Sequence, residues 1–189
     1  MSIYTRTGDF GETSLYSGKR VLKCNDSIDC NGLIDELNSF IGLAVSMTTE
    51  ATTKEFLQEI QKDLCSISAL FSGNTESDLF DGEARVKEME VRIDTMEKNL
   101  IPLQQFILPG GTPLASVIHV TRSIARRVER KAVFMFTHDP QHLPLQISQP
   151  ERIIQYLNRL SDFLFVLARY SNKEENGSER KWSKKRNTV

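Results

Sequence analysis

Residues 110–131 read GGTPLASVIHVTRSIARRVERK, and this stretch decides the fold that the sequence predicts. Thr112 is a favourable N-cap and Pro113 suits the first helical position, so a helix is predicted to begin there. Valine and isoleucine at positions 117, 120, 124 and 128 recur at helical spacing and predict one apolar stripe. The stretch is therefore predicted to be an amphipathic helix that packs in a bundle.

The other side of this predicted helix carries His119, Arg122, Arg126, Glu129 and Arg130. The three arginines are i,i+4 neighbours, and like charges at that spacing cost about 0.2–0.5 kcal/mol per pair. One interpretation is a solvated basic face that keeps the helix soluble. The other is a polyphosphate site, in which planar guanidinium groups pair with phosphate oxygens. Nothing within the helix decides between them.

Length and composition limit the possible classes of protein. The 189 residues predict one domain over 1–189, and 24 basic against 25 acidic residues leave no global charge that would recruit nucleic acid or a membrane. No apolar run reaches the roughly 20 residues of a membrane span. Three cysteines without a CxxC pair favour a reducing compartment, hence the cytoplasm, or the mitochondrial matrix if a transit peptide has been removed. The histidines are too scattered to indicate a zinc site.

Further amphipathic helices complete an all-α prediction. Their apolar residues recur at helical spacing over 29–47, 54–70, 83–98 and 151–171. A polar connection is predicted over 72–82, and a proline-rich loop over 137–150. Residues 101–111 form a short apolar link into the arginine-bearing helix. For Phe106 in this link, core packing is the default interpretation.

The N-terminal residues 3–18 read IYTRTGDFGETSLYSG and predict a structured loop rather than a strand. Loops of this composition present backbone N–H groups and hydroxyls to anions. The pattern differs from a Walker A loop, and an ordinary surface loop remains an alternative. Lys19, Arg20 and Lys23 follow at once and favour the anion-binding interpretation of residues 1–25.

Some polar residues have both a structural and a functional interpretation. Asp35 lies in the early turns of its helix, where the helix dipole favours an acid, or it pairs with an arginine of another helix or subunit. In the last helix, Asn158, Asp162, Phe165 and Arg169 share one side. Structural hydrogen bonding explains that stripe as well as ligand binding does.

The C-terminal segment 173–189 is a tail with six basic and three acidic residues and the single tryptophan, Trp182. Such a composition offers little to a core. We expect this tail to be mobile until a ligand orders it.

Several motifs, in order along the chain, resemble those of the trimeric ATP:cob(I)alamin adenosyltransferases. They are Y-T-R-T-G-D-x-G-x-T-S-L at 4–15, G-x-x-D-E-L-N-S-F-I-G at 32–42, F-I-L-P-G-G at 106–111, H-x-x-R-x-x-x-R-R-x-E-R at 119–130 and N-R-L-S-D-x-L-F at 158–165. The departures, at 71–82 and at Cys30-Asn31, lie in scaffold segments.

The resemblance implies a five-helix bundle with ferritin-like up-down packing, an N-terminal ATP-binding loop, and a homotrimer with active sites between subunits. It implies transfer of the 5′-deoxyadenosyl group of ATP to the cobalt of cob(I)alamin, giving adenosylcobalamin and triphosphate. Cob(II)alamin would be the form reduced on the enzyme, and Mg²⁺ would accompany the triphosphate. A flavoprotein reductant and an adenosylcobalamin-dependent enzyme are the implied partners.

The resemblance also implies roles for individual residues. Asp35 and Arg122 match a pair that bridges subunits beside the corrinoid, and Phe106 matches a ring beneath the corrin. Mg²⁺ is expected near Glu129, without an implied ligand set. Together with Arg126 and Arg130, Asp35, Arg122 and Phe106 form the candidate catalytic set. The implied ATP contacts are Thr5, Arg6, Thr7, Gly8, Thr13, Ser14, Lys23, Arg126, Arg127, Glu129, Arg130 and Asn158.

Two other functions remain open. One is a carrier or sensor of the same fold that binds a corrinoid or a nucleotide without catalysis. The intact arginine motif argues against this alternative. The other is a nucleic-acid binder that uses the basic helix. The basic face has no aromatic residues on which bases could stack, which argues against nucleic-acid binding.

Overall fold

The computed structural model describes residues 4–74, 80–138, 147 and 149–182. The predicted segments 72–82, 137–150 and 173–189 therefore lie partly outside the described residues. Within the described ranges the chain forms five helices and one two-stranded antiparallel sheet. The elements are β1 (Glu12–Ser14), β2 (Arg20–Leu22), α1 (Asp26–Met47), α2 (Ala51–Phe71), α3 (Gly82–Glu97), α4 (Pro113–His138) and α5 (Pro150–Glu174).

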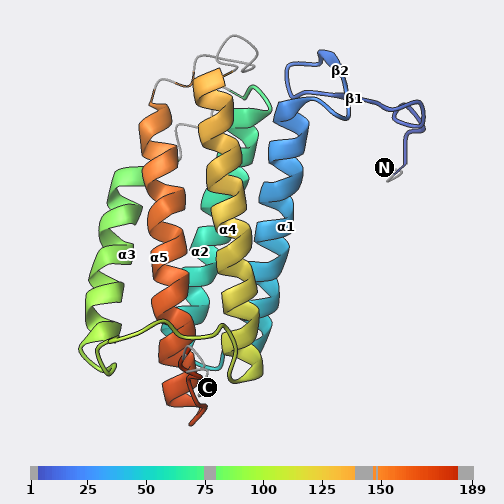
Figure 1. Cartoon of the computed structure of the whole chain (residues 1–189). Coiled ribbons are helices and arrows are strands. Elements are labelled where there is room, and N and C mark those ends of the chain that lie inside the picture. The colour runs from blue at the N-terminus through green and yellow to red at the C-terminus, as the bar shows by residue number, and fades with distance from the viewer. Residues whose placement is uncertain (1–3, 75–79, 139–146, 148, 183–189) are drawn as a thin grey trace, which may run out of the picture.

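The helices run alternately down and up in one bundle (Figure 1). Helix α4 packs against both α5 and α1, while α3 packs on α5 and α2 on α1. The predicted all-α, five-helix fold with up-down packing is thereby confirmed. In the described part of the chain, none of the helices combines the length and hydropathy that a bilayer-spanning segment needs.

Most of the predicted apolar stripes form the core. The Phe56 and Phe163 rings meet edge to face at 5.1 Å. The residues that predicted the apolar stripes of the first two helices are buried: Ile34, Leu37, Ile41, Val45, Phe56, Leu57, Ile60, Leu64 and Ile67. On α4 the prediction was partly wrong, because Val120 is 47% exposed and Val117 is only half-buried. Since α4 lies between α5 and α1, its buried arc is wide and includes Ile118 and the small residue Ala125.

Capping side chains explain where two helices begin earlier than predicted. The Asn25 side chain accepts a hydrogen bond from the Ser27 N–H at 3.0 Å, so α1 starts at Asp26. Glu50 accepts from the backbone N–H groups of Thr52 and Thr53, which starts α2 at Ala51. Both caps satisfy N–H groups that have no partner within the helix.

The N-terminal segment contains the β1–β2 hairpin, so the prediction of a loop without strands was wrong. The hairpin pairs Glu12 with Leu22 and Ser14 with Arg20. In Figure 1 it projects beyond the upper end of α1, on the side away from α5.

Residues 98–112 link α3 to α4 across the lower end of the bundle (Figure 1). The tail after α5 pairs with this link through an antiparallel bridge between Ile107 and Lys181. The Trp182 N–H donates to the Phe106 carbonyl at 2.8 Å, and the Leu108 N–H donates to the Arg180 carbonyl at 2.7 Å. The expected mobility of the tail stays a prediction, but its described part has a defined place against the link.

Candidate functional site

The arginine face of α4, which we define as Arg122, Arg126 and Arg130, is the centre of the candidate site. Arg126 and Arg130 are exposed and Arg122 is half-buried. Among the described residues no carboxylate forms a salt bridge with any of the three. The guanidinium charges of this face are therefore not neutralised within the described chain.

A groove of about 560 Å³ runs beside this face, between α3, α4 and α5. Arg122 and Arg126 line one side of it, and Phe165 lies on the α5 side with the Arg122 guanidinium 5.9 Å from its ring centroid. Burial lowers the pKa of Arg122, and the charge of Arg126 lowers it further. Four carboxylates, those of Glu90, Asp94, Glu97 and Asp162, also line this groove, so its lining is of mixed charge.

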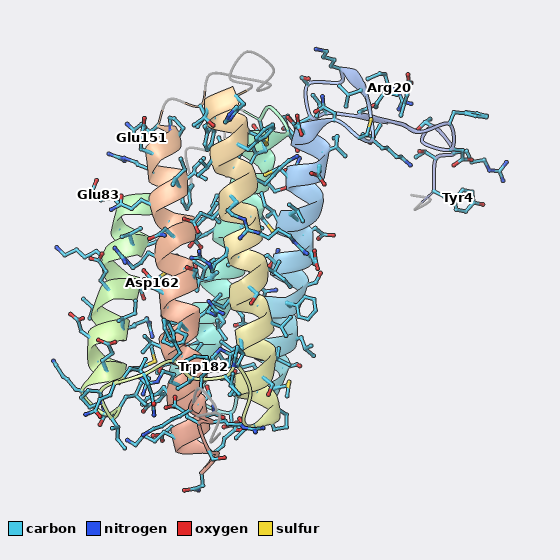
Figure 2. All side chains as sticks on the ribbon, in the orientation of Figure 1. Tyr4, Arg20, Glu83, Glu151, Asp162 and Trp182 are labelled. Atoms are coloured by element: carbon cyan, nitrogen blue, oxygen red, sulfur yellow. The ribbon has the colours of Figure 1, made fainter. Side chains whose placement is uncertain are left out.

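Glu129 and Asn158 connect the arginine face to α5. The Asn158 amide donates a hydrogen bond to Glu129 Oε1 at 3.0 Å, so two residues of the predicted nucleotide set meet across the α4–α5 contact. Asp162, also on this side of α5 (Figure 2), accepts from Arg159 at 2.7 Å. Because Asn158 and Asp162 are both exposed, the predicted polar stripe is buried only at Arg169.

The opposite side of α4 is basic too, but its charges are paired. Arg127 forms a salt bridge with Glu36 of α1. Lys131 reaches Asp26 at 2.6 Å and Asp29 at 2.7 Å. Arg127, which the resemblance placed among the nucleotide contacts, is therefore held toward α1 within one chain, and its role toward ATP stays a prediction.

His119 is buried rather than on the polar side, with only 3% of its surface exposed. Neither ring nitrogen has a hydrogen-bond partner among the described residues. Burial lowers the pKa of His119, the charge of Arg122 lowers it further, and Glu179 opposes both. We conclude that this imidazole is neutral near pH 7. The helical wheel missed its burial because α5 covers this position with Phe165, whose ring centroid lies 6.1 Å away.

The residues of the predicted nucleotide loop lie together around the hairpin, and Arg20 organises them. Its guanidinium donates to the Thr7 carbonyl at 2.7 Å and to Ser14 Oγ at 3.4 Å. The hydroxyls of Thr5 and Thr7 lie 2.9 Å apart. The sequence flagged Arg20 only as a nearby positive charge. Its bonds to two segments of the loop could not be read from spacing.

Three more loop residues have special conformations or close contacts. A Cβ at Gly8 would lie 3.3 Å from Lys23 Nζ, so the absence of a side chain gives the ammonium room beside the loop backbone. Arg6 has a left-handed backbone with φ 61°. Thr13 lies on β1, opposite Val21 of the hairpin. The loop thus presents hydroxyls, backbone and an ammonium group in one region.

The nucleotide loop and the arginine face do not meet within one chain. Figure 2 places Tyr4 and Arg20 beyond α1, whereas Asp162 lies on α5, on the other side of α4. Asp35 and Arg122 also remain apart: Asp35 is exposed on α1 and has no salt bridge among the described residues. The chain therefore carries two separate halves of the predicted site.

Phe106 is not a core residue, so the default interpretation from sequence was wrong. Its side chain is 84% exposed on the link, and Trp182, paired with it through the backbone, is 50% exposed. The described residues contain no group of three or more His, Cys, Asp or Glu that could hold a metal ion. Glu129 alone still fits Mg²⁺ on a triphosphate, because that ion usually takes one or two carboxylates and completes its shell with phosphate oxygens and water.

Comparison with known proteins agrees with this geometry. Residues 3–171 match the family model described as cobalamin adenosyltransferase. The corrinoid adenosyltransferase of Bacillus subtilis is 39% identical over 178 residues, which cover 91% of this chain and 87% of that protein. The corrinoid adenosyltransferase PduO of Citrobacter freundii is 36% identical over 173 residues, covering 89% of this chain and 49% of PduO. The chain thus spans about half the length of PduO.

A solved structure shares the whole fold. It is a variant of the PduO-type ATP:corrinoid adenosyltransferase from Lactobacillus reuteri, complexed with cobalamin and ATP. The superposition has a TM-score of 0.84 at 31% identity and covers 98% of this chain and 97% of that one. Its motifs, its fold and these matches show that the chain belongs to the cobalamin adenosyltransferase family.

Proposed function

We propose that this protein transfers the 5′-deoxyadenosyl group of ATP to the cobalt of cob(I)alamin. Cobalt(I) supplies an electron pair to C5′, the C5′–O bond breaks, and triphosphate leaves with the electrons of that bond. The observation that carries the proposal is the arginine face, whose three cations share one side of α4 and form no salt bridge among the described residues. Such a face suits a leaving group with several negative charges.

The proposed role of the arginine face is to neutralise the charge of the leaving triphosphate. Cob(I)alamin is already a strong nucleophile, so no general base is required. Arg126 and Arg130 are exposed and form no salt bridge among the described residues, so they can pair with phosphate oxygens. Asn158 donates a hydrogen bond to the carboxylate of Glu129 on the same helix. When bound, Mg²⁺ would neutralise part of the triphosphate charge, with Glu129 of α4 as its proposed carboxylate ligand.

We propose further that the working site forms between subunits of a homotrimer. In one chain the nucleotide loop lies beyond α1 (Figure 2), whereas the arginine face lies on α4, on the side of the groove between α3, α4 and α5. A ring of subunits with head-to-tail contacts would bring the loop of one subunit to the arginine face of the next. Asp35 of α1 would then pair with Arg122, which forms no salt bridge among the described residues of its own chain.

Phe106 would control the lower face of the corrin ring. Its exposed phenyl group is apolar and has no lone pair to offer cobalt. A ring in that place would exclude water and the nitrogen base from the lower axial position. Loss of that ligand makes cob(II)alamin easier to reduce, which brings it within reach of a flavoprotein donor. The product would pass to an adenosylcobalamin-dependent enzyme.

The decisive test is anaerobic incubation of the protein with ATP and chemically reduced cob(I)alamin. We expect a product whose absorbance changes irreversibly on exposure to light, because the Co–C bond is photolabile, with one triphosphate released per product. A carrier or sensor of the same fold would bind both compounds and give neither product nor triphosphate. That outcome would overturn the proposed activity.

A further inference from the structure

The link that carries Phe106 is largely exposed: among residues 101–108 only Ile107 is half-buried. Ile101 is 82% exposed and Phe106 84% exposed, so apolar packing does not fix this segment. Its position must come from hydrogen bonds. Those bonds converge on the C-terminal end of α5, and the tail that follows α5 takes part in them.

Arg169 is the first anchor. Only 4% of the surface of Arg169 is exposed. Its guanidinium group forms hydrogen bonds with both the link and the tail. One amino group donates to the Ile101 carbonyl of the link at 2.8 Å. The Glu179 carboxylate of the tail accepts from Nε at 2.7 Å and from the same amino group at 3.2 Å. A planar group with several fixed donors is suited to join two strands of chain in this way.

Asn172, one turn further along α5, is the second anchor. Its side chain donates to the Gly110 carbonyl at 2.9 Å and accepts from the Thr112 N–H at 2.8 Å, at the point where the link enters α4. A Cβ at Gly111 would lie 2.0 Å from Asn172 Oδ1, so only glycine fits there. The Asn172 carbonyl also accepts from the Gly177 N–H of the tail at 2.7 Å. Both anchors therefore hold the link and the tail together.

Between the two anchors, the tail itself supports Phe106. The backbone bonds of Trp182 with Phe106 and of Arg180 with Leu108 flank the Ile107–Lys181 bridge. Glu179 is the residue directly before this paired stretch. Its bond to Arg169 therefore determines where the tail begins to run beside the link.

We propose that Arg169 and Glu179 are positioning residues for Phe106, and that the docking of the tail and the placement of the Phe106 ring are one event. When the ion pair forms, the tail lies along the link and holds the Phe106 backbone. When it is broken, the tail and the ring lose their place together. The proposal rests on the function proposed above only for what the Phe106 ring does to the corrinoid.

Trp182 provides a readout that needs no ligand, because it is the single tryptophan of the chain. In Glu179→Gln we expect acrylamide quenching of its fluorescence to rise about twofold, since the tail is no longer held by a charge-assisted bond. Glu175→Gln is the matched control: the same change on an exposed residue of the same segment, without a salt bridge among the described residues. Unchanged quenching in Glu179→Gln would overturn the proposal that the Arg169–Glu179 ion pair holds the tail in place, whatever the activity of the protein.

A second readout tests the position of the ring. With ATP and cob(II)alamin, we expect the four-coordinate electron paramagnetic resonance signal to fall in Glu179→Gln and in Phe106→Ala, but not in Glu175→Gln. The corrinoid KM should rise about tenfold in Glu179→Gln, as expected for one lost charge-assisted hydrogen bond, while the ATP KM changes less than about twofold. Arg169→Lys, which keeps the charge but lacks the fork, should behave like Glu179→Gln.

The outcomes separate the two proposals. If Glu179→Gln frees Trp182 yet keeps the wild-type cob(II)alamin signal while Phe106→Ala loses it, the positioning of Phe106 is overturned. If Phe106→Ala also keeps that signal, the role proposed for the ring fails, and Trp182 quenching in Glu179→Gln alone decides whether the ion pair docks the tail. Wild-type transfer of the adenosyl group, measured separately, decides the proposed function in either case.

Discussion

The two basic sides of α4 differ in whether their charges form salt bridges within one chain. Arg127 and Lys131 are neutralised by carboxylates of α1, whereas Arg122, Arg126 and Arg130 have no carboxylate partner among the described residues. Both sides belong to the same helix and the same run of sequence. The difference shows that charge alone does not mark a binding site. What distinguishes the arginine face is that its three like charges form no salt bridge among the described residues.

The largest expected effect is on the unpaired side. Arg126→Ala and Arg130→Ala should each lower kcat/KM by about one to two decades, because each removes a charge-assisted contact worth about 1.5–3 kcal/mol to the triphosphate. The free energy of unfolding should stay within about 0.5 kcal/mol of wild type or rise slightly, since like-charge repulsion is relieved. Steady-state kinetics and urea unfolding of the same samples check both. Near-normal kcat/KM in both variants would remove the arginine face from triphosphate binding.

A smaller effect is expected where we propose that the unpaired side of α4 contacts another subunit. Asp35→Asn and Arg122→Met should each lower activity, and the double variant should lose less than the sum of the two. The coupling should be about 1 kcal/mol or more if the residues pair across an interface. A double-mutant cycle on kcat/KM measures it. Additive losses would mean that the two residues act independently.

The paired side should respond in stability rather than in catalysis. Lys131→Met should lower the free energy of unfolding by about 1 kcal/mol, because the half-buried ammonium contacts two aspartates. Adenosyl transfer should stay near the wild-type rate. Lys54→Met, at an exposed lysine without a salt bridge among the described residues, is the control and should unfold like wild type. If Lys131→Met lost activity but not stability, the paired side would serve catalysis as well, which would contradict the proposed difference between the two sides.

The smallest effect concerns His119, which lies between the core and the arginine face. Burial and Arg122 hold its folded-state pKa below the ordinary value of 6.5. The unfolded chain therefore binds more protons near that pH, and stability falls as the pH drops through about 6.5 toward the lower folded pKa, by at most about 1.4 kcal/mol per pH unit. His119→Gln should lack this slope in pH-dependent unfolding, whereas His138→Gln, at an exposed position, should keep it. Equal slopes in wild type and His119→Gln would contradict the assignment.

The sequence was most informative where local periodicity decides the structure. Apolar spacing predicted all the helices, and the residue order along α4 predicted that Arg122, Arg126 and Arg130 share a face. The hairpin was missed because strands of three residues are too short to show alternation and depend on the long-range bonds of Arg20. Spacing also could not tell Arg127 from Arg130, since the difference lies in Glu36 on another helix.

Long-range partners account for the other surprises. Arg169 stood out in the sequence as a polar residue on an apolar helix, but its partners Glu179 and Ile101 lie in the tail and the link. Phe106 resembled a core residue because hydrophobicity does not say which side of a link faces solvent. The resemblance to a family supplied the site residues, and the geometry then divided them into two separate halves.

The central claim is that one subunit's nucleotide loop and the next subunit's arginine face form one site. It can be tested with mixed trimers of two strongly impaired variants, Lys23→Ala in the loop and Arg126→Ala on the arginine face. The variants would carry different tags and be co-expressed, and the doubly tagged protein purified. In a closed ring of three, every mixed trimer holds one site with both halves intact, so we predict about one third of wild-type activity. Activity no higher than that of the two parent variants would contradict a site shared between subunits.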